Sequence, residues 1–326
     1  MPQILACLLI VLLSSCSSTH LRKLEDGDLG QRVSQDVAKR FEVKDLEVIP
    51  TPTPAPTPMT KVKHHRAKKK KMQEKPSPTP IVIDIPDRRP SVFPFSIGEK
   101  LGYDIRYSGF TAGKLEMQVQ AEKEIDGRRA YHLFAHANSS TVMNWLYRVN
   151  DTVESYLDDI GLFSHRFSMD LDESKQTKKS VELYDYQNKK AYYWARINHV
   201  TRGYSEKKED YDIPLWAQDP LSLLYWIRIT ELSRDPTKPT KVSFTLDGKL
   251  WEMVLTYEKT EKKSYAGHDW QAYAFHVVNY QNGEAKNKDN TIWIAADDPH
   301  RYVLCVEAKL KFGSMAAVLD EIHSTP

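Results

Sequence analysis

The chain has 326 residues and a formal net charge of +2, but its charge is unevenly distributed. Residues 61–75 contain eight Lys or Arg and one Glu, so this segment carries +7 and the rest of the chain is mildly acidic. Only three cysteines occur, two of them within the first 16 residues, and the assignment of these two below excludes an intrachain disulfide.

The N-terminus resembles a bacterial lipoprotein signal. Residues 4–13 are apolar and uncharged, which is too short for a membrane-spanning helix but typical of a signal-peptide core. Leu13-Ser14-Ser15-Cys16 then resembles a lipobox, in which the cysteine thiol receives a diacylglycerol. The sequence therefore predicts a signal peptide over residues 1–15 and an acylated Cys16 that anchors the chain to a membrane. The alternative is an ordinary signal peptide with a chance cysteine.

The residue after the lipid acceptor predicts the compartment. In the enteric sorting rule, Asp at this position retains a lipoprotein in the inner membrane, whereas here it is Ser17. We therefore expect an outer-membrane anchor, with the chain facing the periplasm or the cell surface. Cys305 then has no partner, and we expect it to fill a strand position rather than to act as a reactive thiol.

Residues 16–91 are predicted to form the lipidated N-terminus and a disordered linker. Val33, Val37 and Phe41 recur every four residues, which predicts a short amphipathic helix over residues 29–41. A helix of this length needs a partner helix or a membrane surface, and otherwise it frays.

Two proline tracts flank the basic segment. Proline occupies every second position in residues 50–58 and in residues 76–80, a pattern typical of extended polyproline II spacers. The centre of the basic segment is the run Lys68, Lys69, Lys70 and Lys71. Outside the cytoplasm nucleic acid is not an expected partner, so the run would contact cell wall or anionic lipid. The alternative is that the run belongs to a solvated linker without a partner.

Residues 92–326 are predicted to form one β-rich domain. Apolar and polar residues alternate most clearly over residues 101–107, 115–121, 251–257 and 304–312. Further strand-like runs cover residues 130–137, 149–157, 162–171, 180–185, 190–195, 241–246, 272–279 and 290–295. Turn signals such as Asp126-Gly127, Asp247-Gly248 and Asn282-Gly283 separate the runs. We expect an antiparallel meander of about a dozen strands.

One segment breaks this alternation. Asp219-Pro220 is a helix start, with an N-cap Asp and a first-turn Pro, and an apolar face follows that includes Leu224. Arg228 lies within this helix and should meet a carboxylate or backbone carbonyls. The predicted fold class is mainly β: a curved antiparallel sheet, or incomplete β-barrel, wraps one helix, and Leu224 is almost fully buried.

A second, shorter helix is predicted in the first half of the domain. It starts at Ser139 or Ser140 and ends at Tyr147. The residues expected to face inward are Val142, Trp145 and Leu146.

Three stretches together resemble a bacterial envelope family, the domain of unknown function 3108. They are Ile97-Gly98-Glu99-Lys100-Leu101-Gly102-Tyr103 with Tyr107-Ser108-Gly109 and Gly113, then residues 219–228, and then residues 292–298 with Arg301 and residues 310–314. Val303 stands where the family usually has Pro. The resemblance covers about residues 93–322 and implies a sheet curled around a helix, as in the lipoprotein carrier proteins, without an established activity.

No residue pattern in the chain points to catalysis. Motifs for an activated serine, a zinc hydrolase or a phosphate-binding loop are missing from the sequence, so we expect no enzyme, cofactor or metal. His132 and His136 share a strand face but lack an obvious third ligand. Asp297, Asp298 and His300 are expected in a turn whose carboxylates bind their own backbone.

The aromatic residues leave two hypotheses for function. Seven Trp and seventeen Tyr suit the core of a sheet, but some could line a groove for an acyl chain or a glycan. The candidate groove residues are Ser222, Tyr225 and Trp226. The chain would then be a non-enzymatic outer-membrane lipoprotein that binds an amphiphile or glycan. The alternative is a structural or assembly factor that docks to another envelope protein.

Overall fold

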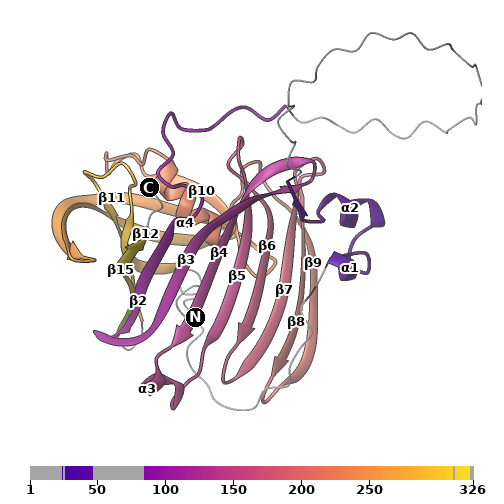
Figure 1. Cartoon of the computed structure of the whole chain (residues 1–326), viewed down its shortest axis with the longest axis horizontal. Helices are drawn as coiled ribbons and strands as arrows, with labels where there is room; N and C mark the ends of the chain where they lie inside the picture. Colours follow the sequence, from indigo (N-terminus) through magenta and orange to yellow (C-terminus); the bar gives the residue numbers. More distant parts are fainter. Residues whose placement is uncertain (1–23, 25, 47–83, 311–312, 324–326) are drawn as a thin grey trace, which may run out of the picture.

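The computed structural model describes residues 24, 26–46, 84–310 and 313–323 (Figure 1). Cys16, the proline tracts and the lysine run at residues 68–71 lie outside this part of the chain. Among the described helices, none has the length and apolar character needed to cross a membrane.

The described residues form a single antiparallel sheet of fifteen strands (Figure 1). In space the strands follow the order β10-β11-β12-β13-β14-β15-β2-β3-β4-β5-β6-β7-β8-β9, and β1 pairs with β3. The first eight strands are β1 (Lys44–Asp45), β2 (Lys100–Tyr107), β3 (Phe110–Ile125), β4 (Arg128–Ser139), β5 (Asn150–Asp158), β6 (Ser164–Asp172), β7 (Gln176–Asp185) and β8 (Lys190–His199). The others are β9 (Gly203–Asp212), β10 (Thr240–Thr245), β11 (Leu250–Tyr265), β12 (His268–Gln281), β13 (Glu284–Ala295), β14 (Val303–Lys309) and β15 (Ser314–His323).

The alternation of the sequence matches the two faces of the sheet. In β2 the side chains of Leu101, Tyr103 and Ile105 are buried, and the residues between them are partly exposed. Both residues of the predicted Asp126-Gly127 turn have positive φ, the geometry that a two-residue hairpin requires. The predicted fold class, a curved antiparallel sheet that does not close, is confirmed.

The two edge strands, β9 and β10, approach each other through side chains instead of strand pairing. Thr245 of β10 donates to Glu182 of β7 (2.8 Å), and Tyr211 of β9 donates to the same carboxyl group. Beyond β10, Asp247 receives hydrogen bonds from Lys178 and from Tyr193. These contacts form the seam at which the sheet curls back upon itself.

The helix α4 (Pro220–Ile229) lies inside the curled sheet and contacts β4, β5 and β10 (Figure 1). Asp219 is its N-cap and Pro220 opens its first turn, as the sequence predicts. Most of its side chains are buried, because strands surround it on several sides. The expected core helix is therefore confirmed.

The N-terminal segment packs on the outer face of the sheet. Its helices are α1 (Asp26–Leu29) and α2 (Gln35–Arg40), so the single helix predicted over residues 29–41 is wrong: the chain breaks before Ser34, which caps α2. Leu29 and Phe41 are fully buried against Trp194 and other outer-face residues. Residues 26–46, assigned to the linker from the sequence, thus pack against the β-rich domain.

The short helix α3 (Thr141–Asn144) contradicts the predicted inward packing. Ser140 caps it as expected, but Val142, Trp145 and Leu146 point into solvent with exposed fractions of 80%, 91% and 65%. The reason is that α3 lies at the tip of the β4–β5 connection, beyond the ends of the strands (Figure 1). The buried residues of this loop are Tyr147 and Val149 instead.

Candidate functional site

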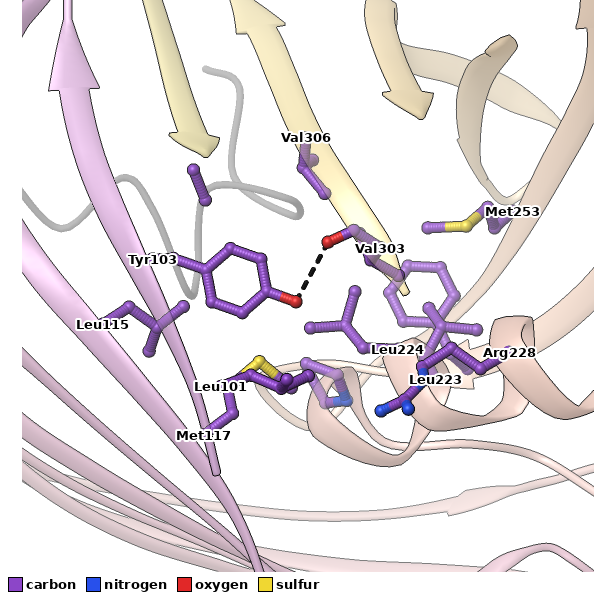
Figure 2. Close-up of a pocket in the computed structure, with 13 residues that line it drawn as sticks. Leu101, Tyr103, Leu115, Met117, Leu223, Leu224, Arg228, Met253, Val303 and Val306 are labelled. Atoms are coloured by element: carbon purple, nitrogen blue, oxygen red, sulfur yellow. Dashed lines mark hydrogen bonds between the residues drawn. The ribbon is translucent and has the colours of Figure 1, made fainter. Parts of the chain in front are cut away.

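An apolar pocket lies between α4 and the concave face of the sheet (Figure 2). The strands that line it come from both ends of the domain, since β2 and β3 meet β14 and β15 there. The lining residues are Leu101, Tyr103, Leu115, Met117, Pro220, Leu223, Leu224, Arg228, Phe244, Met253, Val303, Val306 and Ala317.

A buried hydrogen-bond cluster fixes the start of α4. The carboxylate of Asp219 accepts from the backbone amides of Leu221 and Ser222 (both 2.8 Å) and from the hydroxyls of Ser155 and Ser164 (both 2.5 Å). Burial raises the pKa of Asp219, and the hydrogen bonds from Ser155 and Ser164 oppose this shift. Because Ser155 and Ser164 belong to β5 and β6, the cap also ties the helix to the sheet.

A buried ion pair fixes the other end of α4. The guanidinium of Arg228 donates to both carboxylate oxygens of Glu99 (2.6 and 2.8 Å) and to the backbone carbonyl of Pro94 (2.6 Å). Burial lowers the pKa of Arg228, but the hydrogen bonds to Glu99 and the attraction of its negative charge together raise the pKa above its usual value. The expectation that Arg228 meets a carboxylate or backbone carbonyls is confirmed, since it meets both, and its charge is neutralised locally.

The polar groups at the pocket wall are few and already paired. Among the lining residues, only Tyr103 and Arg228 carry hydrogen-bonding side chains, and the Tyr103 hydroxyl donates to the carbonyl of Val303 (3.0 Å; Figure 2). Burial raises the pKa of Tyr103 well above its usual range, so the hydroxyl stays neutral. The pocket therefore offers mainly van der Waals contact.

The pocket is small in this conformation. Its volume of about 40 Å³ has room for a water molecule or two. Leu224 is half-buried and faces this space, which corrects the expectation that it is almost fully buried. An occupant larger than a few atoms would have to displace the leucine side chains of α4.

The predicted groove residues face away from this pocket. Ser222 is fully buried and its hydroxyl contacts that of Ser164 (2.8 Å), so it belongs to the helix cap. Tyr225 packs edge-on against Phe95, and Trp226 is also buried. None of the three lines the pocket. The signal that could have found the right face is the spacing of Pro220, Leu223, Leu224 and Arg228, one stripe of the helix.

The structure also places the other candidate residues. His132 stacks on Tyr156, with ring centroids 4.7 Å apart, and His136 contacts the Asn150 side chain (2.8 Å). Across the described ranges, no group of three or more His, Cys, Asp or Glu is arranged to hold a metal. Cys305 is buried in β14.

The predicted acidic turn forms as expected. The carboxylate of Asp298 accepts a hydrogen bond from the backbone amide of His300 (2.7 Å). The backbone carbonyl of Asp298 accepts a second one from the backbone amide of Arg301 (3.0 Å). The turn also contacts the pocket wall, because the carbonyl of His300 accepts a hydrogen bond from Arg228 (3.1 Å).

The comparison with protein families identifies the chain. The model of a protein family of unknown function, DUF3108, matches residues 102–320. The chain belongs to the DUF3108 family. The resemblance seen in the sequence is thereby confirmed over residues 102–320, which include α4 and nearly all residues that line the pocket. None of the curated proteins compared with this DUF3108 chain matches it.

Three solved structures are similar to this DUF3108 chain at low sequence identity. A β-barrel-like DUF1849 protein from Brucella abortus has 9% identity and a TM-score of 0.46, over 71% of this chain and 99% of its own. A protein with a YmcC-like fold from Bacteroides fragilis has 10% identity and a TM-score of 0.31, over 71% of this chain and 98% of its own. A candidate lipoprotein from Parabacteroides distasonis has 9% identity and a TM-score of 0.31, over 71% of this chain and 97% of its own.

Proposed function

We propose that the protein is a non-enzymatic, lipid-anchored binding protein of the bacterial envelope that holds an acyl chain of an amphiphile beside α4. The observation that carries this proposal is the apolar pocket between the helix and the curled sheet, lined by both halves of the domain. An acyl chain fits this lining better than a glycan does, because sugar hydroxyls need free donors and acceptors that the wall lacks.

Binding would require α4 side chains to move. The pocket is far smaller than the several hundred cubic ångströms of a typical ligand site. Leu224 is the natural gate, since it is half-buried at the pocket while its neighbours Leu223 and Tyr225 are buried. An incoming chain would replace the contacts that Leu224 makes with the sheet.

The pocket is tested by native mass spectrometry of the protein purified without detergent, before and after addition of palmitate. We expect bound fatty acid or phospholipid in the wild type and its loss in Leu224→Trp, because the indole fills the pocket. Leu215→Trp, at a side chain that is 39% exposed and away from the pocket, is the matched control. A wild-type protein that carries no lipid and takes up no palmitate would contradict the proposal.

The anchor is a separate part of the proposal. Acylation of Cys16 would place the domain at the outer membrane, on its periplasmic side or on the cell surface. We expect Cys16→Ser to leave the protein unprocessed or soluble, because the acyl chains supply the membrane affinity. Membrane fractionation and the intact mass decide the matter, and an unchanged membrane-bound mature form would refute acylation.

One observation favours the alternative role as an assembly factor. An open groove of about 750 Å³ lies on the surface of β10, β11 and β12, lined by Lys241, Trp251, Glu252, Tyr280 and others. Its mixed polar and aromatic lining suits a polypeptide of another envelope protein. In that case the basic linker with residues 68–71 would contact cell wall or anionic lipid. A lipid-free protein in the mass spectra would leave this role as the better one.

A further inference from the structure

Four large apolar side chains are exposed together at the tips of two neighbouring hairpins. Phe110 begins β3, and Val142, Trp145 and Leu146 lie in the β4–β5 connection. Phe110 is 80% exposed and Trp145 is 91% exposed. They are half of the eight large hydrophobic residues that are exposed in the described part of the chain. Such clustering marks a contact surface rather than scattered surface residues.

The two tips lie side by side at one end of the sheet. β3 pairs with β4 at Gly113↔Ser139, and the backbone amide of Ser140 donates to the carbonyl of Ala112 (2.8 Å). Figure 1 shows α3 projecting beyond the ends of these strands. The four side chains, here called the apolar tip, are therefore exposed together at this end of the sheet.

The base of the apolar tip is firmly held. The hydroxyl of Tyr147, a buried side chain, donates to Glu173 (3.0 Å), and Arg148 forms two hydrogen bonds with Asp172 (2.7 and 2.8 Å). The hydroxyl of Ser139 accepts a hydrogen bond from the backbone amide of Val149 (2.8 Å). The exposed residues are thus presented by an anchored loop.

The N-terminal segment leaves the sheet near the same end. Leu24 is buried on the outer face beside Thr152, Asp170 and Lys179. Thr152 is the third residue of β5 and Asp170 the third from the end of β6, so both lie close to the β4–β5 connection. The predicted acyl acceptor Cys16 is only eight residues before Leu24, a span of at most about 28 Å.

The residue types of the apolar tip suit a membrane boundary. The two arginines nearby, Arg106 and Arg148, are paired with Asp104 and Asp172, so the tip carries little net charge. Trp and Phe favour the boundary between head groups and acyl chains.

We propose that the apolar tip dips into the membrane surface and forms a second contact beside the acyl anchor, which holds this end of the sheet against the bilayer. The inference rests on the proposed anchor at Cys16 for its geometry, but the contact itself is made by Phe110, Val142, Trp145 and Leu146. Two contacts at one end fix the orientation of the sheet, which a single anchor leaves free.

The test uses the chain from Ser17 onward, which contains every described residue and no acyl group. A hexahistidine tag ahead of Ser17 tethers it to vesicles of phosphatidylethanolamine with some phosphatidylglycerol and a nickel-chelating lipid. An environment-sensitive fluorophore is attached at Val142→Cys. The native thiol stays unlabelled, because Cys305 is buried and burial raises its pKa to about 12. Val92→Cys, at a valine that is also largely exposed, is the matched control.

We expect the label at position 142 to shift to the blue on vesicles and to be quenched by lipid-borne nitroxides, while the label at position 92 stays in water. Trp145→Ser with Leu146→Ser should weaken binding of the untagged chain to the same vesicles about tenfold or more. A label at position 142 that remains in water on the tethered protein overturns the inference. The inference is also overturned if the wild-type chain forms a dimer and these two substitutions abolish it, because the apolar tip would then bind a second copy of the chain.

These outcomes are independent of the anchor and of the pocket. The vesicle assay involves neither Cys16 nor a bound lipid, so failure of the Cys16→Ser or Leu224→Trp experiments leaves its result unchanged. Conversely, loss of vesicle contact would not bear on acylation in cells.

Discussion

Glu182 illustrates how single buried groups hold the seam of the sheet. Its carboxyl group is 2% exposed and lies between β7, β9 and β10, where it accepts from Thr245 and Tyr211. Burial raises its pKa to about 7, although the hydrogen bonds from Tyr211 and Thr245 oppose the shift. The native seam therefore favours the protonated acid.

This shift predicts a pH dependence of stability. The folded-state pKa is raised above the unfolded value, so the stabilising contribution of Glu182 is complete below about pH 4.5 and is lost as pH rises to about 7. Relative to Glu182→Gln, the wild type should lose about 1.4 kcal/mol of unfolding free energy per pH unit in this window. Denaturant melts of both proteins from pH 4 to pH 8 measure the difference between their unfolding free energies. The titration of all other groups is common to the two proteins and cancels in this difference. A difference that stays constant over this range would contradict the assignment.

At the scale of the element, two leucines of α4 form a natural comparison. Leu221 is fully buried and does not line the pocket, whereas Leu224 is half-buried beside an existing cavity. We expect Leu221→Ala to lower the unfolding free energy by about 2–5 kcal/mol and Leu224→Ala by about 1–2 kcal/mol. Denaturant melts of the two variants test the placement of the helix. Equal losses would mean that α4 presents a different face to the pocket.

The sequence predicts well those elements whose residue pattern is compatible with only one structure. Asp219-Pro220 gives α4 its start, and alternation gives β2 and β11 their faces. β9 was missed because it is an edge strand with mostly charged side chains, which protect the edge but remove the alternation. α3 was oriented wrongly because an apolar pattern does not tell a packed helix from an exposed tip.

At the scale of the whole molecule, the sequence could not predict which distant segments meet. The pocket combines Leu101 with Val303, and the ion pair joins Glu99 to Arg228 across more than a hundred residues. The outer-face packing of Phe41 is equally remote, because its cluster includes residues of β3, β4, β5, β7 and β8. Periodicity reports which side of an element is apolar, and only the strand order decides what covers that side.

That strand order has a consequence for folding. Read from β2 onward, each strand pairs with the next one in the chain until β9, and the same holds from β10 to β15. Two compact meanders of low contact order can therefore form early, each through local hairpins. The pairing of β15 with β2 joins the two across more than two hundred residues, so its loop-closure entropy makes it the slow step. A circular permutant beginning at β10 would turn the whole sheet into one sequential meander and remove that barrier.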